Sequence, residues 1–149
     1  MVKRTSLTDA DCPVARSLDV IGDWWSLLIV RDAFDGVRRF GDFQKSLGAS
    51  KGILASRLRE LVKLGIFTTA PVSDDSAYQE YVLTKKGDDL FPIVVGLRQW
   101  GEAHCFRSSE RHSVLVDNES GRPLARLEVK SRSGRHLRSL DTSVRKVNR

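Results

Sequence analysis

The sequence predicts an α+β fold, in which several helices are followed by a single two-stranded hairpin. The helices are indicated by apolar residues that recur every three or four positions between residues able to cap a helix. The hairpin is indicated by two segments rich in β-branched and aromatic residues, 66–72 and 78–84, on either side of a polar turn. With 149 residues, 40% of them hydrophobic and 30% charged, the chain suits one domain with a small appendage.

Three helices are expected before the hairpin. The first begins at Pro13, because proline is tolerated in the first turn of a helix, and continues to Asp35. A short helix over residues 40–47 stops at Gly48. The third helix begins at Ser50, whose hydroxyl can cap it. Leucines recur on one face of this third helix, and they are Leu54, Leu58 and Leu61.

A long helix over residues 85–106 is expected after the hairpin, and Pro92 and Gly96 should bend or divide it. The complete order is helix, helix, helix, hairpin and long helix. This is the order of a winged helix-turn-helix, in which the helix over 50–64 reads DNA and the hairpin over 66–82 is the wing.

A domain followed by an extension is expected from this order. Residues 1–107 form a DNA-binding domain with dimerisation helices, and residues 108–149 form a basic, β-rich extension. Strand-like segments with turn signals at 118–121 and 131–134 indicate the β structure of the extension. Its role is left open between holding a partner subunit, binding DNA phosphates and recruiting another protein.

Positive charge is concentrated in two zones of the chain. Residues 38–63 carry 7 basic and 2 acidic side chains, and residues 107–149 carry 11 basic and 5 acidic side chains. Residues 1–37 and 64–106 are acidic on balance. Because clustered cations favour a polyanionic partner, the compact first zone indicates double-stranded DNA.

The outer face of the helix over 50–64 has the size and charge that a DNA groove requires. Opposite the leucines, Gly52 and Ser56 permit close approach, and Lys51 and Arg59 can donate to guanine or to phosphate. A solvated helix face gives a similar pattern, and the preceding short helix, tight turn and hairpin favour DNA. The expected DNA contacts are Arg38, Arg39, Ser50, Lys51, Gly52, Ala55, Ser56, Arg59, Lys63 and Gln79.

The tip of the expected wing is acidic. Wings commonly hold DNA through cations, whereas this tip contains Asp74 and Asp75 between two serines. We expect the tip to stay off the DNA, with contact only through the flank near Gln79. The alternative function is a protein–protein interaction module on a winged-helix scaffold that does not bind DNA.

Two stretches, from Cys12 to Phe67 and from Glu80 to Glu102, resemble the HxlR family of bacterial transcriptional regulators, which is similar to the MarR group in architecture. The motifs that carry the resemblance are Cys12–Pro13, the segment from Gly22 to Trp25, Arg39–Phe40, "RLREL" and the segment from Tyr81 to Thr84 before Gly87. The resemblance implies a homodimer on a pseudo-palindromic operator near a promoter. The expected function is therefore a sequence-specific regulator that represses a neighbouring gene.

A homodimer is also indicated by the apolar surface of the helix over 85–106, which exceeds what the last helix of a small monomer should expose. Its recognition helices should lie about 34 Å apart, one turn of the DNA duplex. The expected interface residues are Pro13, Phe91, Val94, Val95, Leu97 and Trp100.

Cys12 is the candidate redox-sensing residue. Several members of the family that the chain resembles carry a cysteine directly before proline at the start of the first helix and use it to sense oxidants or electrophiles. A helix N-terminus favours the reactive thiolate, whereas the carboxylates of Asp9 and Asp11 oppose it. The alternative is an inert small side chain at a dimer interface.

Other chemistry is not indicated. We expect no catalytic residues, no metal site and no cofactor, because His104, Cys105, His112 and His136 lack zinc-ligand spacing and no catalytic motif stands out. Trp24 and Trp25 either line an effector pocket or, as aromatic residues at helical spacing more often do, belong to the core. Without a signal sequence or an apolar run long enough for a membrane span, the expected location is the cytoplasm.

Overall fold

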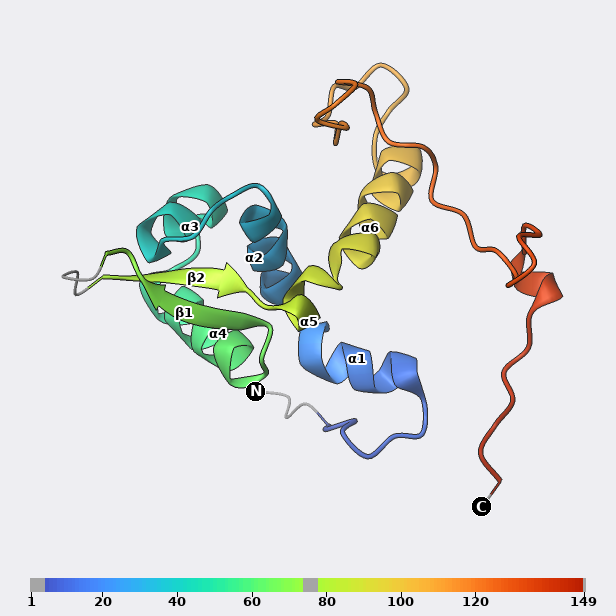
Figure 1. Ribbon diagram of the computed structural model, residues 1–149, viewed down its shortest axis with the longest axis horizontal. Helices are drawn as coiled ribbons and strands as arrows, with labels where there is room; N and C mark the ends of the chain where they lie inside the picture. The colour runs from blue at the N-terminus through green and yellow to red at the C-terminus, as the bar shows by residue number, and fades with distance from the viewer. Residues whose placement is uncertain (1–4, 74–77, 149) are drawn as a thin grey trace. The chain divides into compact units, whose positions relative to one another are not determined.

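The computed structural model describes residues 5–73 and 78–148, which belong to two compact units that divide between Val94 and Val95. The elements are α1 (Pro13–Ile21), α2 (Trp24–Phe34), α3 (Phe40–Leu47), α4 (Lys51–Lys63), β1 (Phe67–Pro71), β2 (Gln79–Leu83), α5 (Lys85–Asp88), α6 (Phe91–His104) and the 3₁₀ helix η1 (Ser139–Asp141) (Figure 1). Helices followed by a two-stranded antiparallel sheet confirm the predicted winged helix-turn-helix fold. The roles expected for residues 1–107 and 108–149 stay predictions.

The first predicted helix is two helices, and the prediction of one continuous helix is wrong. Helix α1 ends before Gly22, and the side chain of Asp23 starts a new helix by accepting hydrogen bonds from the backbone nitrogen and the hydroxyl of Ser26, at 3.0 and 2.6 Å. An aspartate at this position satisfies a backbone N–H that has no partner within the helix, so α2 begins at Trp24.

The core of the first unit lies between α2, α3, α4 and the sheet. The leucine stripe of α4 is buried as predicted, and Phe43 of α3 is fully buried beside it. Phe43, Phe67 and Tyr81 meet edge to face, with ring centroids 6.3–6.5 Å apart. This aromatic cluster joins α3 to both strands of the hairpin and thereby fixes the wing against the helices.

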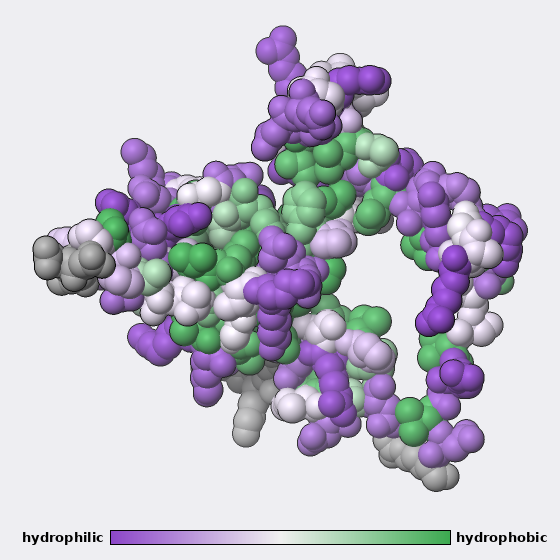
Figure 2. Space-filling model, in the orientation of Figure 1, coloured by the Kyte–Doolittle hydropathy of each residue, from purple (hydrophilic) through white to green (hydrophobic). Residues whose placement is uncertain are grey.

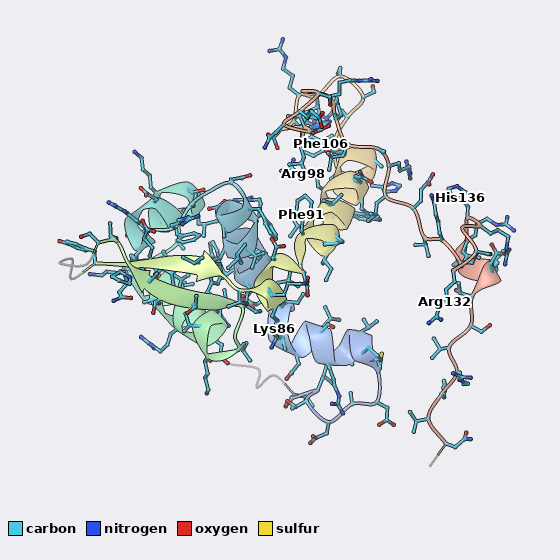
Figure 3. The ribbon with its side chains drawn as sticks, in the orientation of Figure 1. Lys86, Phe91, Arg98, Phe106, Arg132 and His136 are labelled. Carbon is cyan, nitrogen blue, oxygen red and sulfur yellow. The ribbon has the colours of Figure 1, made fainter. Side chains whose placement is uncertain are left out.

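The hairpin pairs in the register that joins Phe67 to Leu83 and Pro71 to Gln79. At its end, the hydroxyl of Thr84 accepts a hydrogen bond from Gly87 N at 3.1 Å and donates to Gly65 O at 2.5 Å. A side chain at Gly87 would collide with the carbonyl oxygen of Ile66, so this close approach requires glycine. The Lys86 ammonium also donates to Leu64 O at 2.7 Å, which fastens α5 to the end of α4 (Figure 3).

The predicted long helix over 85–106 is divided into α5 and α6. The break falls at Asp89–Leu90, just before Pro92, which sits in the first turn of α6. Proline lacks an N–H and fits only the start of a helix, so the expectation that Pro92 marks a boundary is confirmed. Gly96 lies inside α6 without breaking it.

The second unit contains most of α6 and the extension that follows it. The side-chain amide of Gln99 on α6 donates to Ala125 O at 3.1 Å and accepts from Leu127 N at 2.7 Å. We call this pair of hydrogen bonds the Gln99 clamp. Arg98 donates to the carbonyl and the hydroxyl of Ser113, at 3.2 and 2.9 Å. Two stretches of the extension are thus held on one helix.

The extension contains the predicted turns without the predicted strands. Within its described residues, β pairing is limited to two isolated bridges, between Val116 and Pro123 and between Lys130 and His136. In the first turn, the backbone N–H of Glu119 and the hydroxyl of Ser120 hold the pKa of Asp117 below its usual value. Among the described residues, no helix combines the length and the apolarity needed to cross a membrane.

Candidate nucleic-acid interface

Helices α3 and α4 form the helix-turn-helix, and the turn between them is short because of Gly48. This residue has a φ of 64°, a left-handed conformation that glycine adopts without strain. Two residues later, the Ser50 hydroxyl accepts a hydrogen bond from Ile53 N at 3.3 Å and caps α4, as predicted. The other N–H groups of the first turn point away from the helix toward its N-terminal side, where a phosphate can be bound.

The residues predicted to face DNA lie on the outer surface of α4. Ala55 is half-buried at the flank, and the remaining α4 residues of the predicted set are exposed. These residues are Lys51, Gly52, Ser56, Arg59 and Lys63. The helix therefore presents small side chains and cations together, on the face opposite its buried leucines.

Gly52 is not required by the fold. A Cβ atom at this position would meet no heavy atom within 4 Å, and the backbone is ordinary helix. Glycine inside a helix costs roughly 0.5–1 kcal/mol relative to alanine. A small residue that destabilises its own helix, on the exposed face near the N-terminus, is expected where another molecule approaches closely.

Ser56 and Lys63 also border a polar cavity of about 510 Å³ that α4 forms with α1 and α2. The cavity is lined by three carboxylates as well, those of Asp19, Asp23 and Glu60. Because these carboxylates lie around the same cavity, we expect Lys63 to contribute less to phosphate binding than Lys51 or Arg59.

Arg57 was not among the predicted site residues. Its guanidinium lies 3.7 Å from the carboxylate of Asp23, the residue that caps α2. The ion pair connects α4 to the start of α2, and we expect it to orient α4 rather than to contact DNA.

Arg38 and Arg39 lie just before α3, and their side chains are 59% and 60% exposed. Each lies near the carboxylate of Glu80 on β2, at 3.9 and 3.8 Å. No pattern in the sequence indicates this shared partner, because the ion pairs form only once the hairpin folds back beside α3. The two arginines are thus positioned beside the tip end of β2, close to the exposed Gln79.

The acidic tip of the wing, with Asp74 and Asp75, lies outside the described residues. The prediction that the tip avoids DNA therefore stays a prediction. The described residues on either side of the tip, Ser73 and Tyr78, are both exposed.

Helix α6 carries a stripe of exposed apolar side chains, which we call the α6 stripe. It consists of Ile93, Leu97 and Trp100, with 44%, 52% and 62% of their surfaces exposed. Apolar surface over α6 is visible in Figure 2. Phe91, also predicted for the interface, is 40% exposed and packs edge-on against Phe34 of α2. Surface of this kind is expected where another chain binds.

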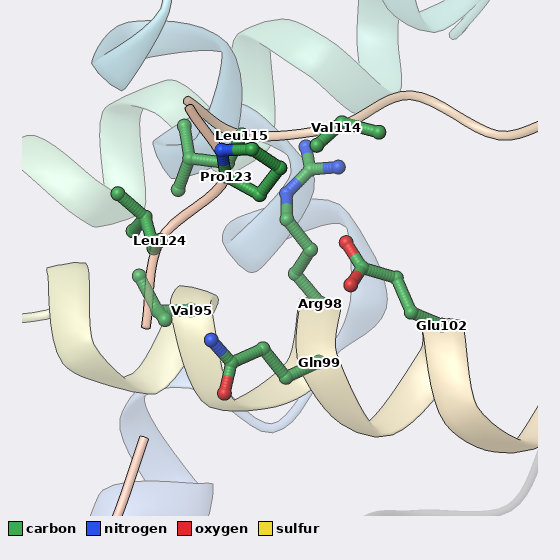
Figure 4. Close-up of a pocket in the computed structure, with 8 residues that line it drawn as sticks. All are labelled: Val95, Arg98, Gln99, Glu102, Val114, Leu115, Pro123 and Leu124. Carbon is green, nitrogen blue, oxygen red and sulfur yellow. The ribbon is translucent and has the colours of Figure 1, made fainter. Parts of the chain in front are cut away.

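Val95 does not belong to this exposed surface. It is only 6% exposed and lines a cavity of about 30 Å³ beneath the extension, together with Leu115, Pro123 and Leu124 (Figure 4). Val94, also expected in the interface, is half-buried, and Pro13 is exposed. The extension thus covers one face of α6 within the same chain and leaves the α6 stripe open.

Cys12 is the N-terminal cap residue of α1, directly before Pro13, and its thiol is free and exposed. Cys105, just after α6, is also free and exposed. Trp24 is 74% exposed and contacts Trp25 edge-on, whereas Trp25 packs against the core. In the described part of the chain, no three His, Cys, Asp or Glu side chains are grouped so as to hold a metal ion.

Comparison with known proteins identifies a family whose sequences resemble this chain. Residues 20–109 match the family model described as HxlR-like helix-turn-helix. The HTH-type transcriptional regulator MT3179 of Mycobacterium tuberculosis, itself uncharacterised, is 50% identical over 94 residues. This alignment covers 63% of this chain and 60% of the relative, so the chain spans less than two thirds of the relative's length.

Two solved structures are informative. The crystal structure of PA1607, a proposed transcription factor, superposes with a TM-score of 0.91 at 53% identity and covers 96% of this chain and 100% of its own. The redox regulator HypR in its reduced form superposes with a TM-score of 0.58 at 34% identity and covers 63% of this chain and 94% of its own.

Proposed function

The chain belongs to the HxlR-like helix-turn-helix family, and we propose that it is a homodimeric transcriptional regulator that represses by binding a pseudo-palindromic operator. The observation that carries the proposal is the outer face of α4, where Gly52 and Ala55 leave room for base edges between Lys51 and Arg59. Helix N-termini of this kind enter the major groove in helix-turn-helix proteins. The names of the relatives, which are HTH-type transcriptional regulators, support the same function.

The proposed dimer forms through the α6 stripe and the region of Cys12 and Pro13. A twofold axis would bring each stripe against its copy, since the same surface is used on both subunits. Two recognition helices then face successive major grooves, about 34 Å apart on one side of the duplex. Such a dimer, bound beside a promoter, represses by occupying the DNA that the polymerase needs.

The test is a salt titration of binding to the DNA upstream of the protein's own gene. Replacing Lys51, Arg59 and Lys63 together by Gln should weaken binding and flatten the plot of log K against log salt, by about one unit of slope for each phosphate that the variant no longer neutralises. The matched control replaces Arg111, Arg122 and Arg126 in the extension by Gln, which removes the same charge. If the α4 variant keeps the wild-type affinity and slope while its circular dichroism is unchanged, α4 does not bind DNA.

A response to oxidants is a second part of the proposal, supported by the exposed thiol of Cys12 and by the similarity to the redox regulator HypR. Two Cys12 thiols, one from each subunit, would give up two electrons and two protons to an oxidant such as diamide and form a disulfide between subunits. This bond would shift one recognition helix relative to the other.

Diamide should therefore change the DNA affinity of the wild type severalfold and leave Cys12→Ser unchanged. Cys105→Ser is the matched control and should respond like the wild type. A Cys12→Ser variant that responds as strongly as the wild type would refute the role of Cys12.

A further inference from the structure

The second half of the extension is held mainly by its own local turns. We call residues 128–148 the arm. It contains a small turn, in which Leu137 N donates to Val129 O at 2.9 Å, and then η1 and an extended stretch. The hydrogen bonds and ion pairs that the structure gives for the described arm join arm residues to one another, as between Glu128 and Lys130 at 3.8 Å. The described arm thus lies beyond the Gln99 clamp and is not fastened to α6 in the same way.

The arm is nevertheless rich in exposed apolar side chains. Leu140 and Val144 are each 85% exposed, and Val129 and Val147 are each 66% exposed. Side chains of the arm, among them Arg132 and His136, stand out from the backbone in Figure 3. A segment that only keeps a protein in solution needs charge and no aliphatic residues, so these four side chains indicate a surface that packs against protein.

The path of the arm is shared with a related chain. The superposition with PA1607 covers 96% of this chain at a TM-score of 0.91, so it includes much of the arm. An extended segment loses considerable conformational entropy when it adopts one path, and local turns alone do not compensate for this loss. A path that recurs in two chains therefore indicates contacts that a single chain does not supply.

The charge of the arm identifies the surface that it fits. The arm has six basic and two acidic residues, a net charge of +4. Residues 5–35, which include α1 and α2, have six acidic and two basic residues. Asp32 is buried and paired with Arg31, and the other charged residues, which are exposed or half-buried, carry a net charge of −4 beside Val14, which is 66% exposed. An apolar and basic arm complements an apolar and acidic surface.

We propose that the arm of one subunit packs on residues 5–35 of a second copy of this chain. The inference rests on the homodimer of the proposed function. In addition to the contact at the α6 stripe, the arm of each subunit contacts residues 5–35 of the other subunit. Each subunit is then held both by helix packing and by the arm of its partner. A DNA duplex is a less suitable occupant, because phosphates do not require Leu140, Val144 or Val147.

The test replaces Leu140, Val144 and Val147 together by Ser in the full chain and measures the dimer dissociation constant by sedimentation without DNA. We expect at least a tenfold increase. A second variant replaces Arg138, Arg145 and Lys146 by Gln and should weaken the dimer at low salt but not at high salt, because screening already removes the charge contribution there. Circular dichroism should be unchanged in both variants, since the hydrogen bonds of the arm within the described chain are local.

Three outcomes would overturn the proposal. If neither variant changes the dissociation constant, the arm does not contact the second copy. If the dimer is unchanged and only the charge variant loses DNA affinity, the arm binds DNA. A monomeric wild type at micromolar concentration would overturn the proposed dimer together with the arm contact, whereas the α4 variant tests DNA binding separately and should keep the wild-type dimer.

Discussion

Helices α4 and α6 both carry an apolar stripe, but only one of them is buried by its own chain. On α4, Leu54, Leu58 and Leu61 are at most 1% exposed. On α6, the α6 stripe is 44–62% exposed although the opposite face of the same helix is covered by the extension. The apolar surface of α4 therefore serves the stability of the subunit, whereas that of α6 is available for assembly.

The largest effect should follow from removing part of the buried stripe. Leu58→Ala leaves a cavity among side chains that cannot fully collapse, and it should lower the free energy of unfolding by about 3 kcal/mol. Urea denaturation followed by circular dichroism, at several protein concentrations, measures this change. A loss below about 1 kcal/mol would mean that α4 is less firmly held by its core than its burial indicates.

An intermediate effect is expected at the exposed stripe. Leu97→Ser should raise the dimer dissociation constant about tenfold, which corresponds to about 1.4 kcal/mol. The matched control is Leu127→Ser, since Leu127 is 51% exposed, close to the 52% of Leu97, and lies outside the stripe. If the two substitutions raise the dimer dissociation constant equally in sedimentation, the apolar stripe of α6 has no special role in assembly and does not differ from that of α4 in this respect.

The smallest change in stability, and the sharpest distinction in function, is expected for Gly52→Ala. It should stabilise the subunit by roughly 0.5–1 kcal/mol, because alanine is the better helix former, and it should weaken DNA binding severalfold by adding a methyl group to the face that approaches the bases. Gly101→Ala in α6 is the matched control, because Gly101 also has open space around it. Only the Gly52 variant should lose affinity in a binding titration.

Local signals explain which elements could be predicted from the sequence. The start of α4 at Ser50, the stop of α3 at Gly48 and the burial of the α4 leucines depend on residues within one or two turns of each other. The break before α2 also depends on a local signal, the cap at Asp23. The apolar residues before and after Asp23 continue at helical spacing, so the periodicity alone predicts one uninterrupted helix.

The extension shows what a local pattern does not determine. Apolar and charged residues alternate from Leu127 to Lys130, as in a strand. A strand also needs a neighbour with which its backbone pairs, and within the described extension such pairing is confined to isolated bridges. The ion pairs of Arg38 and Arg39 with Glu80 were unpredictable for a similar reason, because residues about 40 positions apart meet only in the folded unit.

The Gln99 clamp has a consequence for how the protein behaves as conditions change. The carboxamide carries no charge and does not titrate, so its two hydrogen bonds to the extension do not depend on pH and respond little to ionic strength. Contacts between cations and DNA phosphates, in contrast, weaken steeply as salt rises. If the proposed DNA binding is correct, a rise in ionic strength should therefore release the protein from DNA while its extension stays bound to α6. The released protein can then bind DNA again without refolding.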